Sequence, residues 1–585
     1  MSLESEKKDA SELAIKQVLS QENGITTFIS PNTGKPVTIT GDVDDAIAYA
    51  ENIDAAFEVD PAEDRRLLRK IDLYLLPLIC ITYCVQFMDK QTISYGAILG
   101  LRKDLKMVGD QYSWAGSAFY FGYLFYEFIG SYTLQRFKLT WMLSFYIVLW
   151  GVILCLHSVP QYPGFVVLRV LLGALESSIT PAFMIITSQW YKKEEVFFRT
   201  ALWFASNGIG TMLGSGAIAY NVYKHEKSFS LTPWKLIFII TGVITIALGV
   251  AIFFHIPSKP TDAWFLNEKE KKMVVERIRG NQQGFGNKHF KKAQFYETLL
   301  DRRTWILFAM GVLCNIPNGG LTNFGSILLK EKLGYSTGKS LLMGMPLGAV
   351  EIAGLVAICY CYKFIPYRLF WAVFTYCIVV MATCFLAFAK NQTLQFAGYS
   401  MTSLLAISSI FILSLIASNC AGHTKKVTTN AIYLIGYCVG NLIGPQTFIP
   451  KQAPSYTSAV VAMVACNCLV IVLMLILWVD YYLDNKRRDA NMNSDLVREF
   501  EMLENHEFAD LTDKENPLFR TSGLRGQIEY QNDTNIKVTL TALQVIFNKY
   551  GTEEYSDVAA GIAFLNEPLG PMSDTTQLKN FYLWA

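Results

Sequence analysis

Two acidic and two basic residues lie inside stretches of this sequence that are otherwise apolar. Asp89 and Lys90 are adjacent in QFMDKQTISYGAILGL, and Arg169 and Glu176 are seven residues apart in LRVLLGALESSITPAF. Seven residues are about two turns of an α-helix, so Arg169 and Glu176 share one helix face. Charges inside apolar spans are costly and usually functional. A carboxyl group there can exchange a proton, and a cation can hold an anion, which suits a carrier that couples anions to protons. The alternative is an ion-pair network that only locks helices together.

Further acids and amides lie in other apolar stretches. Glu127 and Glu351 are either additional proton sites or groups that pair within a helix bundle. Asn315 and Asn318 flank Pro317 in NIPNGGLTNF, and a helix broken there would offer backbone amides to a ligand. A hinge without ligand contact is the alternative for this stretch.

Three more asparagines, Asn207, Asn430 and Asn441, are weaker candidates. Asn207 lies in SNGIGTMLGSG, whose small residues favour close packing of helices over ligand binding. No metal site is expected, because the cysteine spacing does not match that of zinc sites. We interpret the cysteines as small apolar side chains of the core.

Composition indicates the environment in which these residues act. Hydrophobic residues make up 52% and charged residues 17% of the 585 residues. The mean hydropathy is +0.28. This balance is typical of polytopic membrane proteins, whose lipid-facing surface is also apolar. The net charge of +2 gives no indication of a nucleic-acid partner, and no cofactor other than a coupling proton is expected.

The apolar stretches predict an all-α protein with twelve membrane spans in two six-helix halves. A span needs about 20 mainly apolar residues. The expected spans are 72–99, 112–133, 140–157, 163–190, 198–220, 234–256, 304–328, 338–360, 367–389, 394–417, 427–449 and 457–482.

The domain division follows from these spans. We expect a cytosolic tail over 1–70, a six-helix half over 71–256, a central loop over 257–303, a second half over 304–482 and a second tail over 483–520. The basic central segment EKEKKMVVERIRGNQQGFGNKHFKK is expected to be helical in part and cytosolic. The excess of Lys and Arg on one side of the spans places both termini in the cytosol.

A six-plus-six layout with a basic central loop resembles the major facilitator superfamily, in which two halves rock around a site near the midplane. The acid–base pair Asp89–Lys90, followed by Arg169, Glu176 and Pro181, is similar to the pattern of the anion:cation symporter family. Within that family the chain resembles the fungal allantoate permeases over about residues 25–520. The stretches that carry this similarity include QFMDK, GLRKDLKMVGDQYSW, RVLLGALES, RIRGNQQGFGN, NIPNGG and GPQTFIPKQAP.

The resemblance implies a transporter, not an enzyme, that imports small organic anions with protons across the plasma membrane as a monomer. It implies proton-coupling roles for Asp89 and Glu176 and carboxylate-contacting roles for Lys90 and Arg169. The implied substrates are allantoate, ureidosuccinate and some dipeptides. Nicotinate, pantothenate or biotin transport, and a non-transporting nutrient sensor on the same fold, are the alternatives.

Residues 521–585 do not belong to this pattern. The stretch GIAFLNEPLGP resembles part of an exo-1,3-β-glucanase barrel, with Glu567 at the position of the acid/base. A retaining glycosidase needs a second carboxylate about 5 Å away, and a complete barrel takes about 250 residues. We therefore expect an inactive and mostly disordered remnant, since one strand and one helix cannot bury their apolar faces.

Overall fold

The structure is a computed structural model of the chain. It describes residues 26–29, 36–39, 61–159, 161–279, 291–362, 364–365, 367–490, 512–514, 519 and 521. Apart from Thr521, the expected remnant 521–585 with its Glu567 lies outside the described residues. A small antiparallel pair, β1 (Thr26–Ile29) and β2 (Pro36–Ile39), falls within the expected first tail, with Thr26 opposite Ile39. All other described secondary structure is helical.

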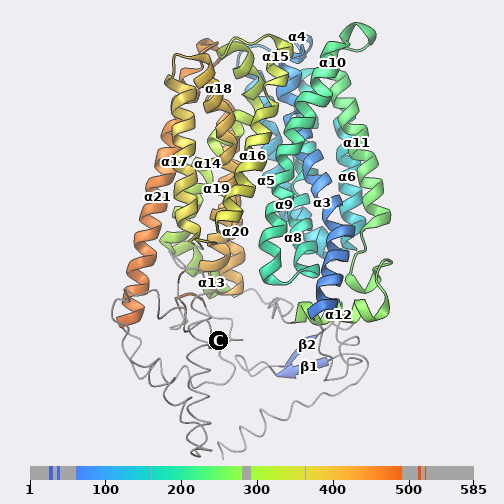
Figure 1. Ribbon diagram of the computed structural model, residues 1–585, viewed down its shortest axis with the longest axis vertical. Helices are drawn as coiled ribbons and strands as arrows, with labels where there is room; N and C mark the ends of the chain where they lie inside the picture. Colours follow the sequence, from blue (N-terminus) through green and yellow to red (C-terminus); the bar gives the residue numbers. More distant parts are fainter. Residues whose placement is uncertain are drawn as a thin grey trace, which may run out of the picture. The chain divides into compact units, whose positions relative to one another are not determined.

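The helices that precede the central segment pack together into the N-half (Figure 1). They are α3 (Pro61–Ile98), α4 (Leu101–Asp104), α5 (Gln111–Arg136), α6 (Leu139–Leu156), α7 (Tyr162–Glu176), α8 (Ile179–Trp190), α9 (Lys193–Met212), η1 (Leu213–Ala219), α10 (Tyr220–Lys224), η2 (Glu226–Ser228) and α11 (Pro233–His255). The first helix begins eleven residues before the expected span, with Glu63 and Asp64 in its first turn, where acids favour a helix start.

The helices that follow the central segment pack together into the C-half (Figure 1). They are α14 (Arg302–Ile327), η4 (Leu328–Lys332), α15 (Thr337–Leu342), α16 (Met345–Tyr362), α17 (Arg368–Phe388), α18 (Gln392–Met401), η5 (Thr402–Leu404), α19 (Leu405–Asn419), α20 (His423–Gln446), η6 (Pro450–Gln452) and α21 (Thr457–Ala490). The central segment holds η3 (Pro260–Asp262), α12 (Glu268–Arg279) and α13 (Lys292–Leu300), which confirms its expected helical part.

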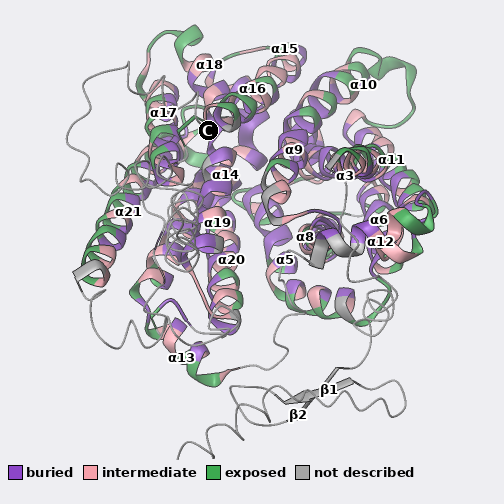
Figure 2. Cartoon of the chain, turned by 60° about the horizontal axis from the view of Figure 1, so that its bottom comes forward, coloured by how far each residue is buried: buried purple, intermediate pink, exposed green. Residues whose placement is uncertain are grey.

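Ten of the described helical segments are long and apolar enough to cross a membrane. The two other expected spans, 112–133 and 198–220, coincide with α5 and with α9–η1, which are helical but richer in Gly, Ser and Thr. The all-helical polytopic fold is therefore confirmed, whereas the count of twelve spans stays a prediction. Figure 2 shows buried residues inside each bundle and exposed residues outside. Exposed side chains such as Phe125 (73%) and Phe254 (76%) fit a lipid-facing surface.

The expected break of the helix at Pro317 does not occur, because α14 runs without interruption from Arg302 to Ile327. Proline removes one backbone hydrogen bond, which a packed membrane helix can tolerate. A break occurs instead between α7 and α8, at Ser177 and Ser178, directly after Glu176. Pro181 lies four residues beyond Ser177 and cannot donate a helical hydrogen bond to its carbonyl.

The two halves are held together at the end of the bundle that carries α4 and α15, which we call the α4/α15 end (Figure 1). There the Tyr112 hydroxyl donates to the carbonyl of Asn323 (2.6 Å), and the Ser117 hydroxyl donates to that of Leu442 (2.8 Å). Arg102 also forms an ion pair with Glu331 (3.1 Å). The opposite end, which carries α12 and α13, is the α12/α13 end. Among the described residues, the hydrogen bonds that the structure shows between the N-half and the C-half all lie toward the α4/α15 end.

Candidate functional site: a buried charge network

Two glycines set the position of the helix that carries Arg169 and Glu176. A Cβ at Gly122 of α5 would lie 1.8 Å from the carbonyl oxygen of Val170 of α7, and a Cβ at Gly173 would lie 1.8 Å from that of Phe119. Only glycine fits at these two points, because real side chains do not approach a backbone oxygen so closely. The backbones of α5 and α7 are therefore in direct contact, one turn from Arg169.

Lys90 and Glu176 form a buried ion pair between α3 and α7. The Lys90 Nζ atom lies 2.9 Å from Glu176 Oε1, and the side chains are 11% and 0% exposed. The Gln86 amide also donates to Glu176 Oε1 (3.1 Å), whereas Glu176 Oε2 is buried with no hydrogen-bond partner in the described part of the chain. Oε1 of Glu176 therefore has two donors, from Lys90 and Gln86, and Oε2 has none among the described residues.

Arg169 is buried beside this pair with part of its guanidinium unused. Its Nε donates to the carbonyl of Ala115 (3.2 Å), and its Nη1 has no hydrogen-bond partner among the residues that the structure describes. The guanidinium lies 5.1 Å and Lys90 Nζ 5.4 Å from the ring centre of Phe119, so both cations contact the same aromatic ring. An unpaired N–H on a buried cation is a strong donor for an incoming anion.

Asp89, although adjacent to Lys90, belongs to a different contact. One residue turns a helix by about 100°, so consecutive side chains face different neighbours. Asp89 is fully buried, and its Oδ2 lies 2.6 Å from the Thr245 hydroxyl of α11. The same hydroxyl lies 2.9 Å from the carbonyl of Thr241.

These two contacts of Thr245 bear on the protonation of Asp89. A hydroxyl has one hydrogen to donate. If Asp89 is ionised, the Thr245 hydroxyl donates its hydrogen to the carboxylate. The Thr245 hydroxyl then has no hydrogen left to donate to the Thr241 carbonyl. If Asp89 is protonated, it donates to Thr245, which donates to Thr241, and both contacts are satisfied. A protonated Asp89 would therefore satisfy both contacts of Thr245 at once.

Aromatic side chains connect this network to the C-half. The ring of Phe119 contacts that of Tyr120 (5.0 Å between centres), and Tyr120 contacts Tyr437 of α20 (6.2 Å). Tyr120 is buried, and its hydroxyl has no hydrogen-bond partner within the described residues. The Tyr437 carbonyl accepts a hydrogen bond from Asn441 (2.9 Å), which leads to the amides of the C-half.

Three asparagines form a chain of hydrogen bonds between α14 and α20. Asn318 donates to Asn441 Oδ1 (3.0 Å), and Asn441 donates to Asn315 Oδ1 (3.3 Å). Asn315 in turn donates to the carbonyl of Gly311 (2.8 Å) and is buried. Asn318 is only partly buried, so it is the member of the chain with surface left for a ligand. The structure thus brings Asn315 and Asn318 together but gives Asn315 a positioning contact.

The remaining candidates take no part in the Lys90–Glu176 ion pair or in the chain of asparagines. Glu127 on α5 and Glu351 on α16 are both buried, and the structure shows no ion pair for either within its described residues. Asn207 precedes Gly208, where a Cβ would lie 2.5 Å from the carbonyl of Gly348 in the C-half. The predicted close packing around Asn207 is therefore confirmed. Asn430 is exposed on α20, eleven residues or about 16 Å along the helix from Asn441.

Several residues of the network were not predicted from the sequence as part of a site. Gln86 and Thr245 are polar residues within apolar stretches, and Phe119 and Tyr120 are indistinguishable by type from lipid-facing aromatics. Asn441, by contrast, is one of the weaker candidates named from the sequence, and the structure places it in the chain of asparagines. No three His, Cys, Asp or Glu side chains of the described ranges converge in a way that would hold a metal ion.

Comparisons with known proteins agree with this architecture. The family described as the Major Facilitator Superfamily matches residues 79–445. The allantoate permease of Saccharomyces cerevisiae is 49% identical over 528 residues, which cover 87% of this chain and 96% of that protein. An uncharacterized transporter of Schizosaccharomyces pombe is 48% identical, over 82% of this chain and 93% of its own length.

A solved structure shows the same fold at low identity. The crystal structure of a D-xylose-proton symporter aligns with a TM-score of 0.52 at 14% identity, over 69% of this chain and 97% of its own. None of these comparisons indicates a glucanase fragment in residues 521–585. The matching proteins are transporters and not enzymes, and this chain is likewise a polytopic membrane protein that belongs to the major facilitator superfamily of transporters.

Proposed function

We propose that the chain is a proton-coupled symporter that imports small organic anions, with allantoate, ureidosuccinate or dipeptides as substrates. The observation that carries this proposal is the buried Arg169 with its unpaired Nη1 beside the Lys90–Glu176 pair. With Asp89 protonated, two cations and one carboxylate leave a net charge of +1. A substrate carboxylate neutralises that charge and accepts a hydrogen bond from the unpaired Nη1–H of Arg169. The 49% identity to an allantoate permease favours ureido-carboxylates.

The proton step follows from the partners of the two acids. An arriving carboxylate competes with Glu176 for Lys90, and we propose that a proton then neutralises the buried Glu176, which has lost its cation. We take Asp89 to be protonated as well, in the arrangement in which it donates to Thr245 and Thr245 donates to the Thr241 carbonyl. Proton binding at Glu176 and anion binding at Lys90 and Arg169 therefore favour each other, which is the requirement for symport.

The amide end of the substrate has a complementary partner in the C-half. Asn441 fixes the side chain of Asn318 by accepting one of its hydrogens, and Asn315 fixes Asn441. The oxygen and the second hydrogen of Asn318 match the donor and acceptor of a ureido or peptide group. Nicotinate has a carboxylate but no such group, so its transport does not depend on Asn318 in this proposal.

Transport requires that the site open alternately to each side. The contacts of Tyr112 with Asn323 and of Ser117 with Leu442 block the α4/α15 end and must break when the halves rock. We place the protein in the plasma membrane as a monomer with twelve spans and with the α12/α13 end and both termini in the cytosol. The Lys and Arg residues of the central segment support this orientation.

An uptake panel tests the substrate and separates a carrier from a sensor. Cells that lack their own carriers would express the chain and receive labelled allantoate, ureidosuccinate, a dipeptide, nicotinate, pantothenate or biotin. We expect allantoate uptake that rises as the external pH falls. Asn318→Ala should reduce allantoate uptake about tenfold, because one or two hydrogen bonds are lost, and the exposed Asn430→Ala serves as its control. Substrate-induced signalling without uptake would overturn the proposal.

A further inference from the structure

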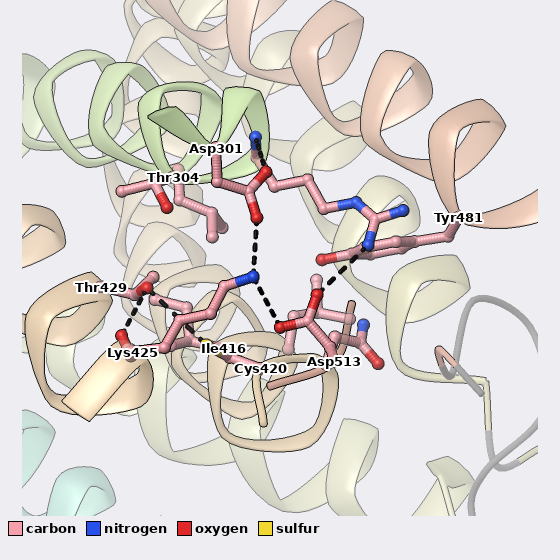
Figure 3. Close-up of a pocket in the computed structure, with 12 residues that line it drawn as sticks. Asp301, Thr304, Ile416, Cys420, Lys425, Thr429, Tyr481 and Asp513 are labelled. Atoms are coloured by element: carbon pink, nitrogen blue, oxygen red, sulfur yellow. Dashed lines mark hydrogen bonds and ion pairs between the residues drawn. The ribbon is translucent and has the colours of Figure 1, made fainter. Parts of the chain in front are cut away.

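Part of the segment that follows α21 is docked on the C-half. Residues 512–514, 519 and 521 contact side chains at the α12/α13 ends of α14, α20 and α21. Asp513 lines the pocket shown in Figure 3. Asp513 is 1% and Thr521 3% exposed, which is the burial of core residues. The sequence predicts a cytosolic tail over 483–520. This polar segment has no hydrophobic periodicity that would indicate packing against the helices.

Asp513 is the charged anchor of the docked segment. Its Oδ1 lies 2.7 Å from Lys425 Nζ, and its Oδ2 lies 3.7 Å from Arg303 Nη1 (Figure 3). Lys425 is buried at the start of α20 and also pairs with Glu297 (2.8 Å) and Asp301 (2.9 Å). An acid from the segment thus enters a buried cluster in which the cations belong to the membrane helices.

Lys425 has a marked effect on one carboxyl group of the cluster, that of Asp301. Burial raises the pKa of the Asp301 carboxyl, but the hydrogen bond and charge of Lys425 more than offset this, and its pKa lies below the usual value. Arg303 is shared in the same way between Asp480 (2.5 Å) and Asp484 (2.9 Å) of α21. Asp513 contacts both cations and therefore connects the start of α14, the start of α20 and the end of α21 electrostatically.

Hydrogen bonds to the main chain anchor the segment a second time. Arg488 of α21 donates to the carbonyl of Asp513 (2.7 Å) and to that of Phe519 (3.2 Å). The Asn485 amide donates to the carbonyl of Thr521 (2.7 Å) and accepts from its backbone N–H (3.0 Å). These contacts satisfy buried backbone groups and do not require particular side chains between the anchors.

We propose that the described residues of this segment, 512–514, 519 and 521, form a strap that holds the α12/α13 ends of α14, α20 and α21 together as one rigid unit. The direct partners of the strap, Lys425, Arg303, Asn485 and Arg488, all belong to the C-half. The strap therefore stabilises that half and does not bridge the two halves. The folded transporter therefore includes the strap as an integral part, independently of which substrate it carries.

Hydrogen exchange of the full chain in nanodiscs, read by mass spectrometry, tests the strap. In the parent chain, peptides over 512–521 should exchange slowly, at rates typical of folded segments. Asp513→Ala should speed exchange there by at least about tenfold, since a buried ion pair is lost. The same change should appear in peptides over 480–490, because the end of α21 loses its partner.

Two further variants make the test specific. Lys514→Ala is the control. Lys514 is half exposed, and its ion pair with Asp301 is long (3.5 Å), so its removal should leave the exchange of 512–521 unchanged. Asn485→Ala removes the second anchor without touching the ion cluster and should speed exchange mainly around Thr521. Fast exchange over 512–521 in the parent chain, or unchanged exchange in both Asp513→Ala and Asn485→Ala, would overturn the strap.

Discussion

Replacement of Glu176 by glutamine removes the negative charge of the central ion pair and keeps the shape of the side chain. Lys90, 2.9 Å from Glu176 Oε1 and almost fully buried, then becomes an unpaired cation. It contacts the same Phe119 ring as Arg169, so the two cations also repel each other. Both effects act against the folded state of the N-half and against release of a bound anion.

The structure sets the size of this effect. Removal of one partner from a buried ion pair costs about 3–5 kcal/mol. The glutamine oxygen can still accept from Lys90 and Gln86, so we expect the lower limit, about 3 kcal/mol, or about 150-fold in the unfolding equilibrium. The double variant Lys90→Met/Glu176→Gln has no unpaired charge and should recover most of this loss.

Two assays separate stability from coupling. Thermal unfolding of the parent chain, both single variants and the double variant gives the interaction energy of the pair. In proteoliposomes, Glu176→Gln should exchange internal for external allantoate but should not accumulate it on a proton gradient. The reasoning about the pair is wrong if the double variant is no more stable than Glu176→Gln. The role in coupling is wrong if Glu176→Gln accumulates substrate with the pH dependence of the parent.

Further predictions concern the other groups of the account. Arg169→Lys should weaken allantoate transport about 10- to 100-fold in kcat/KM although the charge is kept, because an ammonium cannot offer two parallel N–H groups to a carboxylate; transport at the parental rate would make the arginine structural. Asp89→Asn should abolish accumulation, and Thr245→Val should reduce it less, as read from uptake at two external pH values; parental accumulation in both would exclude Asp89 from the proton path. Removal of residues 522–585 should leave transport per surface molecule unchanged, whereas removal of 512–585 should lower the thermal midpoint, and equal midpoints would contradict the strap. Because the folded-state pKa of Asp301 is lowered, its stabilisation is present above an unfolded value of about 4 and is lost as the pH falls through the folded pKa; Asp301→Asn should therefore flatten the decline of the thermal midpoint in that acidic range.

The sequence identified the charged residues of the site but not their partners. Periodicity places Arg169 and Glu176 on one face of a helix, and the structure agrees. Adjacent residues such as Asp89 and Lys90 face different neighbours, and only the packing of α3 against both α7 and α11 shows which neighbour each contacts.

Other features depend on contacts between segments that are distant in the sequence. Pro317 predicted a broken helix, but packing of α14 against α20 keeps the helix continuous, with Gly319 against Asn441. The ion pair of Asp513 with Lys425 joins residues 88 positions apart, and no local pattern indicates such a pair. Local sequence therefore predicted the helices and the charges, whereas the hydrogen-bond chains and the strap required the three-dimensional structure.

Simultaneous measurement of allantoate and proton flux tests the central claim most directly. Purified protein would be placed in liposomes that contain a pH-sensitive dye. Labelled allantoate would then be added outside, with the same pH on both sides of the membrane. The account predicts that allantoate entry acidifies the interior, and that Glu176→Gln abolishes this acidification while Asn430→Ala does not. Allantoate entry without proton entry in the parent protein, or no entry of any carboxylate of the uptake panel, would contradict it.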